Sequence, residues 1–405
     1  MKKKALVVGL GIAGMSAAVA LRQAGWEPVI VERSMERRTG GYFVGLFAPG
    51  KDAAAKLGVL DDIGLEARTL HHSRTWEVDR RGKRHASAGF LDEPSMPAGI
   101  LRSDVEAALW KAVEGQIDVR FGTTPVSIAT TETEATVELY NAFNRQTSTE
   151  TFDLVVGADG LRSSVRQMVF GPHEQFMKSW DSIICAFQMD EHVPGFDRRD
   201  GLVAAEVGRS LWVFPFENHP PTALFTFRTK DIDAQFADGP ATALERKYAG
   251  LDHDSIRHAM AQLGNSEFSL YDSVHSVEMP EWRKGRVILL GDSAWCLTLY
   301  SGMGASSALK GGAHLSEVLS ASPDDVTGAL NRWEGGMREF IAGLRKPARK
   351  KHEIFVPSTW WQKIRRSALL RFAGKFYAPQ ADAARRAVAE KYALEQASET
   401  ASKVA

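Results

Sequence analysis

The sequence has little of what several classes of protein require. Its 405 residues include two cysteines, Cys185 and Cys296, far apart and away from any histidine cluster, which excludes a disulfide framework and a metal site. Lysine and arginine balance aspartate and glutamate at 50 each, so no net charge favours nucleic acid. No apolar run reaches the roughly 18 residues of a membrane-spanning helix. The sequence therefore predicts a reduced, cytoplasmic protein without metal or nucleic acid.

The N-terminal segment has the pattern of a dinucleotide-binding βαβ unit. Residues 4–8 predict a buried strand, 12–24 a helix and 28–32 a second strand. A G-x-G-x-x-G turn lies between the first strand and the helix, and consists of Gly9, Leu10, Gly11, Ile12, Ala13 and Gly14. In this context the glycines allow a tight turn, a close approach of pyrophosphate and close helix–strand packing. The helix N-terminus offers N–H groups to the phosphates.

A carboxylate stands where a bound ribose is expected. Glu32 lies 18 residues beyond Gly14, at the end of the second strand, and can accept hydrogen bonds from ribose hydroxyls. The same charge would repel the extra phosphate of NADP. These residues do not distinguish NAD from FAD.

The predicted type of secondary structure changes twice along the rest of the chain. The segment 103–114 predicts a helix with Ser103 as its N-cap, and 125–149 predicts a β-hairpin. Residues 176–278 alternate in an aromatic-rich pattern, and 285–292 return to a buried strand. We therefore expect an α/β fold: a Rossmann-like dinucleotide-binding domain with an inserted antiparallel β-sheet substrate domain and a C-terminal helical segment. The expected bounds are 1–175 and 279–345 for the nucleotide domain, 176–278 for the sheet domain and 346–405 for the C-terminal helices.

The C-terminal segment is basic and aromatic. Between Arg345 and Phe376 there are ten lysines or arginines and the single acidic residue Glu353, together with Trp360 and Trp361. One interpretation is peripheral adsorption to an anionic membrane surface. The alternative is a helix that packs its tryptophan face on the protein and leaves its charges in water.

Three ordered motifs carry a resemblance to a known family. The first is the glycine turn, the second is Asp153 to Arg166 (DLVVGADGLRSSVR), and the third is Gly285 to Leu309 (GRVILLGDSAWCLTLYSGMGASSAL). With these motifs the chain resembles FAD-dependent monooxygenases of the para-hydroxybenzoate hydroxylase type over residues 4 to about 320. The spacing is most similar to that of the tetracycline-inactivating flavin monooxygenases, which implies aromatic hydroxylation or antibiotic modification as the class of reaction.

The resemblance implies roles for individual residues. FAD is expected to contact the first motif and the residues that correspond to the family's other conserved positions, namely Gly9, Gly11, Ile12, Ala13, Gly14, Glu32, Arg33, Arg102, Asp159, Asp292, Gly302, Met303 and Gly304. Asp292 would accept from the flavin ribitol, and the turn at 302–304 would present N–H groups to the pyrimidine edge. As an alternative, Asp159 and Asp292 would serve only as turn or helix-cap residues. For the substrate we expect Phe214, Pro215, Phe225 and Arg228.

Two departures affect the loop that faces the reacting edge of the flavin. Many members carry histidine at Trp295 and prolines near Thr298 and Leu299, and members commonly have glutamine at Met303. The resemblance implies that NAD(P)H reduces FAD as a transient co-substrate and that O2 then forms a flavin C4a-hydroperoxide, which hydroxylates an aromatic or polycyclic molecule. No catalytic acid or base is assigned, and His71 and His72 are interpreted as solvated.

Other functions stay open at this point. A flavin dehydrogenase or reductase of the same fold would turn over without oxygen transfer. A halogenase is disfavoured because the segment Trp212 to Pro215 only partly matches the tryptophan motif of that class. A flavin-bound sensor or membrane-associated adaptor would use the basic C-terminal segment instead of catalysis.

Overall fold

The computed structural model describes residues 2–37, 40–64, 74–93, 97–216, 219–251, 253–266 and 268–376. The chain divides into two compact units. The first unit contains Met1–Ala67, Ile100–Ser182 and Asp272–His352, and the second contains Arg68–Gly99, Ile183–Tyr271 and Glu353–Ala405. His71, His72 and the end of the expected C-terminal segment, 377–405, lie outside the described residues.

A parallel sheet forms the centre of the first unit. In the described part of the chain its order is β17 (Arg283–Lys284), β18 (Val287–Leu289), β11 (Leu154–Gly157), β1 (Lys4–Val8), β2 (Glu27–Val31) and β7 (Asp118–Arg120). All pairs are parallel except β17 with β18. The central strands are buried apolar runs, as expected for a sheet covered on both faces. The predicted βαβ unit and the α/β fold class are confirmed.

Helices cover this sheet, and two of them pack at very close range. Ser16 in α1 (Ile12–Gln23) donates from its hydroxyl to the carbonyl oxygen of Ala308 in α11 (Gly304–Ala321) at 3.2 Å. A Cβ on Gly312 would lie 2.8 Å from Ser16 backbone atoms, so only glycine allows this approach. The other helices that lie wholly within this unit are α2 (Ala48–Lys56), α3 (Leu60–Ile63), α5 (Arg102–Val113), α6 (Ser164–Val169), α7 (His173–Phe176) and α10 (Asp292–Trp295).

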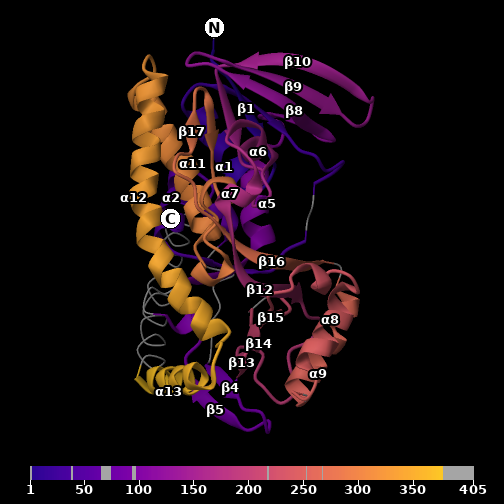
Figure 1. Cartoon of the computed structure of the whole chain (residues 1–405). Coiled ribbons are helices and arrows are strands. Elements are labelled where there is room, and N and C mark those ends of the chain that lie inside the picture. The colour runs from indigo at the N-terminus through magenta and orange to yellow at the C-terminus, as the bar shows by residue number, and fades with distance from the viewer. Residues whose placement is uncertain are drawn as a thin grey trace, which may run out of the picture. The chain divides into compact units, whose positions relative to one another are not determined.

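Two smaller sheets and a 3-10 turn complete the regular structure that surrounds the parallel sheet. The predicted hairpin is a three-stranded antiparallel sheet of β8 (Thr123–Thr130), β9 (Ala135–Asn141) and β10 (Gln146–Phe152), drawn in Figure 1. The polar stretch that we interpreted as a turn therefore continues as an exposed strand. A second small sheet pairs β3 (Phe43–Leu46) with β6 (Ala98–Leu101), and a 3-10 turn, η4, spans Leu299–Ser301.

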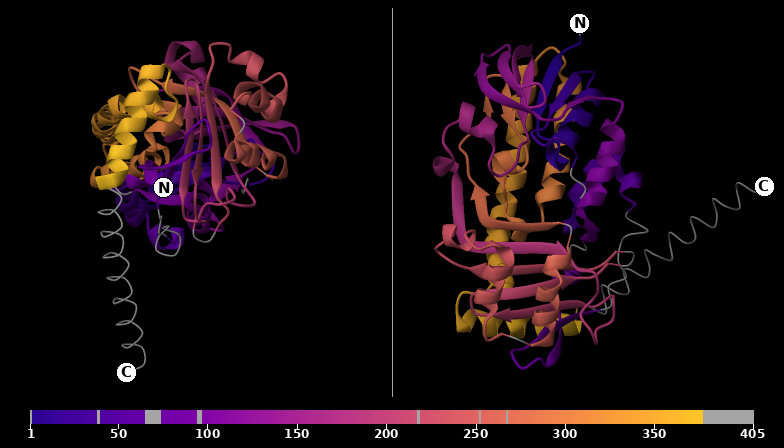
Figure 2. Two further views of the ribbon diagram at one scale, coloured as in Figure 1. Left: turned by 90° about the horizontal axis from the view of Figure 1, so that it is seen from below. Right: turned by 90° about the vertical axis from the view of Figure 1, so that its right-hand side faces the viewer.

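The second unit is built on a seven-stranded sheet, counted over the described residues. Its order is β16 (Ser269–Val277), β12 (Met177–Gln188), β15 (Thr222–Arg228), β14 (Arg209–Phe214), β13 (Gly201–Glu206), β4 (Thr75–Val78) and β5 (Arg84–Ser87). Figure 2 shows these strands side by side. The pairs β13–β14 and β14–β15 are antiparallel, as predicted for residues 176–278. The pair β4–β5 is also antiparallel, whereas β4 joins β13 in parallel. Helices α8 (Gly239–Tyr248), α9 (Asp254–Ala261) and α13 (Trp360–Phe376) and the 3-10 turns η1 (Phe90–Asp92), η2 (Asp233–Gln235) and η3 (Leu263–Asn265) also belong here.

The units include segments that the sequence did not assign to them. β4 and β5 come from residues 75–87, which we had placed in the nucleotide domain. β4 pairs with β13, and this long-range pairing leaves no local signal in the sequence. The helix α12 (Val326–Phe355) runs through residue 345, where we had placed a boundary. The predicted Ser103 cap is wrong: α5 begins at Arg102, follows the extended Leu101 and has no side-chain cap.

Candidate functional site

The carboxyl ends of the central strands bring the three sequence motifs together. The N–H of Gly9, after β1, donates to the carbonyl oxygen of Val31 at 2.8 Å. The N–H of Ala158, after β11, donates to Val8, and the N–H of Leu290, after β18, donates to Gly157, both at 2.9 Å. Ligands of doubly wound sheets bind at this edge. Segments that lie far apart in the sequence therefore share one edge of the sheet.

The glycine turn leaves space at one position only. A Cβ on Gly9 would lie 2.6 Å from the carbonyl oxygen of Ala158, and a Cβ on Gly14 would collide with the carbonyl oxygen of Gly9. Among the described residues, a Cβ on Gly11 would meet only Nη2 of Arg102, at 3.8 Å. The first and third glycines are thus required for packing, and the second faces open space beside a guanidinium.

Glu32 is held in position by backbone donors. Its Oε2 accepts from the N–H of Leu10 at 2.9 Å, and its Oε1 accepts from the N–H of Ser34 at 2.8 Å. A carboxylate has about four acceptor positions, so each oxygen retains one for a ligand hydroxyl. The adjacent Arg33 is exposed.

Arg102 lies at the N-terminus of α5 and forms an ion pair within that helix. Its Nη2 is 2.7 Å from Oε1 of Glu106, and its N–H donates to the carbonyl oxygen of Tyr42 at 2.9 Å. Burial acts to lower the pKa of Arg102, but the electrostatic influence of Tyr42, Glu106 and Asp292 raises it above its ordinary value. Arg102 is therefore a permanent cation beside the glycine turn.

Asp159 organises the second motif as a helix cap. Its Oδ1 accepts from the hydroxyl of Ser163 at 2.5 Å, and its Oδ2 accepts from the N–H of Ser164 at 2.6 Å and of Val165 at 3.1 Å. Ser163 in turn accepts from the N–H of Arg166 at 2.9 Å. These partners all belong to the loop and first turn of α6.

Arg166, which we did not predict as a site residue, connects the second motif to the third. The side chain is fully buried, and Nη1 donates to the carbonyl oxygen of Ser293 at 2.9 Å while Nη2 donates to that of Leu161 at 2.7 Å. Ser293 donates from its hydroxyl to Gly157 at 2.6 Å, which ties the third motif to the end of β11. The available sequence signal was the position of Arg166 at the end of the second motif.

Asp292 follows β18 and is exposed at the same sheet edge. Protein atoms around its carboxyl group nevertheless reduce the solvation of the charged form, and this raises the pKa of Asp292 above its ordinary value. A hydrogen bond from Cys296 and the charge of Arg102 act in the opposite direction but are outweighed. The donor set of this edge therefore combines a backbone turn, a guanidinium and two carboxylates. Such a set fits a dinucleotide with ribose and ribitol hydroxyls.

Comparisons with known proteins decide the family. The model of the family described as "FAD binding domain" matches residues 2–324. The chain belongs to this FAD binding domain family. An uncharacterised Mycobacterium tuberculosis protein is 30% identical over 84% of this chain and 91% of its own length. A flavin-dependent monooxygenase from Legionella longbeachae is 26% identical over 85% of this chain and 87% of its own length.

The fold of this flavoprotein also matches solved structures. The crystal structure of tetracycline destructase Tet(51) superposes with a TM-score of 0.73 at 23% identity, and covers 93% of this chain and 98% of that chain. The family and its monooxygenase relatives confirm that the chain is an FAD-dependent oxidoreductase of the flavin monooxygenase group. Among the described residues, no helix is long and apolar enough to cross a membrane, and no group of three or more histidine, cysteine or acidic side chains could hold a metal.

The loop that precedes α11 departs from the expected arrangement. Thr298 has φ +65°, a conformation that a β-branched residue rarely adopts. The N–H groups of Gly302 and Met303 donate to the carbonyl oxygen of Leu299 at 2.9 Å and to Oγ of Ser301 at 3.0 Å. In this flavoprotein both groups are thus engaged within the loop instead of being presented to a ligand.

Trp295 is part of the protein core. It is fully buried, donates from Nε1 to Oγ of Ser307 at 3.1 Å, and packs against Trp282 with ring centroids 4.7 Å apart. The position that carries histidine in many family members therefore stabilises a buried aromatic cluster here.

The expected substrate residues separate onto two faces of the second unit's sheet. Phe214 and Trp212 stack with ring centroids 6.3 Å apart, and both line a narrow cavity of about 10 Å³, roughly the space of one water molecule, with Pro215 and Phe90. Phe225 pairs with Leu211 and lies in the opposite core, against Phe187 and Tyr248. Alternation along β14 and β15 explains this separation, because Phe225 opposes Leu211 and Phe214 opposes Thr222.

Arg228 shares the face of Phe214 by alternation but is bonded elsewhere. Its Nε donates to the carbonyl oxygen of Val356 at 2.9 Å, and it does not line the narrow cavity. The structure therefore brings together Phe214 and Pro215 and leaves Phe225 and Arg228 apart from them. Trp212 and Phe90 were not among the expected site residues.

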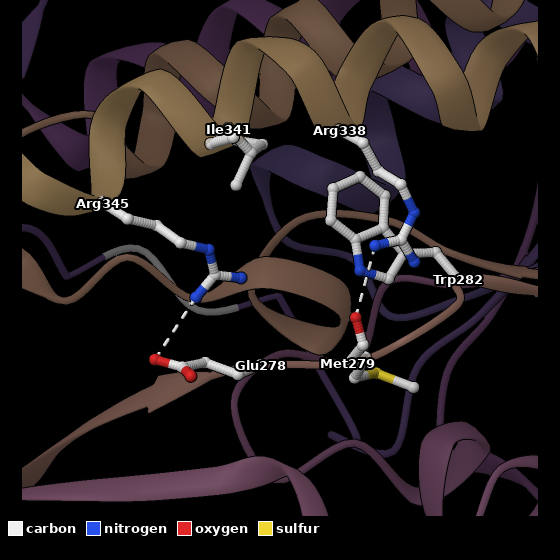
Figure 3. A pocket seen from close by; sticks show the side chains of 7 residues that line it. Glu278, Met279, Trp282, Arg338, Ile341 and Arg345 are labelled. Atoms are coloured by element: carbon white, nitrogen blue, oxygen red, sulfur yellow. Dashed lines mark hydrogen bonds and ion pairs between the residues drawn. The ribbon is translucent and has the colours of Figure 1, made fainter.

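A larger cavity of about 400 Å³ lies elsewhere in the first unit. Figure 3 shows it lined by Glu278, Met279, Trp282, Arg338, Ile341 and Arg345. Arg338 lies over the ring of Trp282 at 4.5 Å and donates to the carbonyl oxygen of Met279 at 3.3 Å. The lining includes none of the residues of the three motifs, so size alone does not locate the cofactor site.

Proposed function

We propose that this flavoprotein uses NAD(P)H and O2 to hydroxylate a planar aromatic or polycyclic small molecule. The observation that carries the proposal is the shared sheet edge where the glycine turn, Glu32, Arg102 and Asp292 supply complementary groups for FAD. The similarity to a flavin-dependent monooxygenase supports oxygen transfer as the reaction.

The proposed cofactor contacts follow from the donor set. Gly11 and the N-terminus of α1 would bind the pyrophosphate, with Arg102 as counter-charge. Glu32 would accept from the ribose and Asp292 from the ribitol, since both carboxylates stand at strand ends with acceptor capacity. Bound FAD would supply the oxygen-activating chemistry, which no side chain can provide.

Asp159 and Arg166 would act by positioning. Asp159 caps α6, and Arg166 fixes the short helix α10, which carries Asp292 and Ser293. The expected interpretation of Asp159 as organiser agrees with its partners, and we propose no direct contact with FAD for it. We retain Gly302, Met303 and Gly304 in the proposed site only as the turn that begins α11.

The proposed substrate surface is the aromatic face of the second unit. Phe90 meets Phe214 edge to face, with centroids 6.3 Å apart, and Trp212 stacks on Phe214. A planar ligand would stack on these aromatic side chains, and because the cavity between them measures about 10 Å³, its binding would require them to move apart. We therefore propose Phe214, Pro215, Trp212 and Phe90 as substrate contacts and leave out Phe225.

The first test is cofactor retention by a matched pair of variants. Gly11→Val places a side chain in open space beside Arg102, so it should fold yet weaken FAD binding at least about ten-fold. Gly335→Ala is the control, because a Cβ there meets nothing within 4 Å and the residue belongs to α12. Flavin absorbance and fluorescence titration measure binding, and equal affinities in the two variants would remove Gly11 from the site.

The second test concerns the reaction. Reduced nicotinamide oxidation is screened with aromatic compounds, and substrate-stimulated O2 consumption with a product that gains one oxygen atom is the expected result. Equal turnover without oxygen, or an unmodified product, would instead identify a reductase of the same fold. A protein that neither contains nor binds FAD would contradict the whole proposal.

A further inference from the structure

Helix α13 has its polar and apolar faces reversed relative to an ordinary surface helix. Arg366 is 3% exposed, and its Nη1 lies 2.6 Å from Oε1 of Glu77 on β4, which is also 3% exposed. Arg371 and Lys363 are bound as well, by Glu77 at 2.7 Å and by Glu206 at 2.6 Å. The helix therefore directs these three basic side chains toward the sheet of its own unit.

The opposite side of α13 presents large apolar side chains to solvent. Their exposed fractions are 59% for Trp360, 70% for Trp361, 39% for Ile364, 56% for Leu369 and 62% for Phe372. A helix on a soluble protein normally directs this face inward. Contiguous exposed apolar surface of this kind marks an interaction site.

The charge of α13 identifies the kind of partner. The helix contains five lysines or arginines and no acidic residue. Lys363, Arg366 and Arg371 are bound by Glu77 and Glu206, whereas Arg365 and Lys375 are exposed beside the apolar residues. The partner must therefore combine negative charge with an apolar interior.

We propose that α13 adsorbs this protein to an anionic lipid bilayer surface, with Trp361 and Leu369 inserted at the headgroup level. Tryptophan and leucine beside basic residues are the composition of helices that lie in the membrane interface. A symmetric contact with a second copy of the chain would place Arg365 and Lys375 against the same charges, which disfavours that occupant. The helix lies on the surface, because no described helix is suited to cross a membrane.

The structure also explains why the reversed helix is stable in water. The N–H of Ala88, next to β5, donates to the carbonyl oxygen of Leu370 at 2.9 Å, and the hydroxyl of Ser367 donates to Oε1 of Glu77 at 2.6 Å. Arg366 also donates from Nε to the carbonyl oxygen of Ile354 at 2.6 Å. Polar contacts therefore hold the inner face and leave the apolar face available for lipid.

The test is vesicle co-sedimentation of the full chain loaded with FAD. Phosphatidylcholine vesicles are compared with vesicles that contain roughly one third phosphatidylglycerol, at low and high salt. We expect binding to the anionic vesicles that decreases with salt. Arg365→Gln with Lys375→Gln should weaken binding by about five-fold per charge removed, and Trp361→Glu with Leu369→Glu should weaken it at least about ten-fold.

A matched control is available on another element. Phe143, between β9 and β10, is 61% exposed, so Phe143→Glu makes the same chemical change on an exposed aromatic residue and should leave binding unchanged. Flavin absorbance and thermal unfolding verify that each variant is folded. Failure to bind anionic vesicles, equal binding to neutral ones, or an equal effect of Phe143→Glu would overturn the proposal. A dimer that the Trp361 variant dissociates would overturn it in favour of a second copy.

Discussion

Glu77 provides a sharp test of how the second unit holds α13. Its two carboxylate oxygens accept hydrogen bonds from Arg366, Arg371 and Ser367, at distances of 2.6 to 2.7 Å. The substitution Glu77→Gln keeps the shape of the side chain and removes its charge. Arg366, which is almost completely buried, would then lose the carboxylate with which it forms an ion pair.

The expected magnitude follows from this burial. Removing one partner of a buried pair costs about 3–5 kcal/mol, because the remaining charge is left uncompensated. An exposed pair is worth only about 0–1 kcal/mol. Asp238→Asn is therefore a matched control, since Asp238 pairs with Arg246 at 3.0 Å and both side chains are about half exposed.

Thermal unfolding with bound FAD and amide hydrogen exchange of α13 are the assays. We expect Glu77→Gln to lower the midpoint by several degrees, at roughly 2–4 °C for each kcal/mol, and to speed exchange in α13. Asp238→Asn should change neither by a comparable amount. If the two variants behave alike, the buried ion pair is not what attaches the helix, and the reasoning is refuted.

Three further predictions follow from the same structure. Burial acts to raise the pKa of Glu77, but Arg366 and the hydrogen bonds from Ser367 and Arg371 hold it below its ordinary value of 4.5. The stabilisation by the Glu77 carboxylate is therefore complete above pH 4.5 and is lost as the pH falls through the lower folded-state pKa. The difference in stability between wild type and Glu77→Gln should shrink in acid, and a difference independent of pH would contradict this. Arg166→Met should destabilise the protein by about 1–3 kcal/mol for each carbonyl oxygen that it leaves without a donor, those of Ser293 and Leu161, and should weaken FAD binding; unchanged melting and FAD titration would argue against the link. Phe214→Ala should raise the KM for an aromatic substrate, whereas Phe225→Ala should leave the KM unchanged; both side chains are buried, so each substitution should also cost about 3–5 kcal/mol of stability, and the reverse pattern in KM would exchange their assignments.

Local patterns predicted most of the cofactor side. The glycine turn, the buried strands and Glu32 lie where the sequence placed them, because each depends on residues close together in the chain. The cap of α5 was wrong because Leu101 already adopts the extended conformation that precedes the helix, one residue earlier than a serine cap requires.

The substrate side was less predictable. Phe214 and Phe225 have similar sequence surroundings, and only the register of β14 against β15 assigns them to different faces. The bonding of the Met303 N–H to Ser301 likewise depends on the backbone of the loop around Thr298, which no family motif specifies.

The sequence alone determined the dinucleotide turn, the α/β class and the basic, aromatic character of the C-terminal segment, since these follow from spacing and composition. The tertiary structure decided how distant segments meet: Arg166 with Ser293, and Glu77 with Arg366. It also decided that the tryptophans of α13 face solvent while its arginines face the sheet, contrary to the packing alternative. Such pairings depend on long-range burial and charge, which the order of residues along a helix does not express.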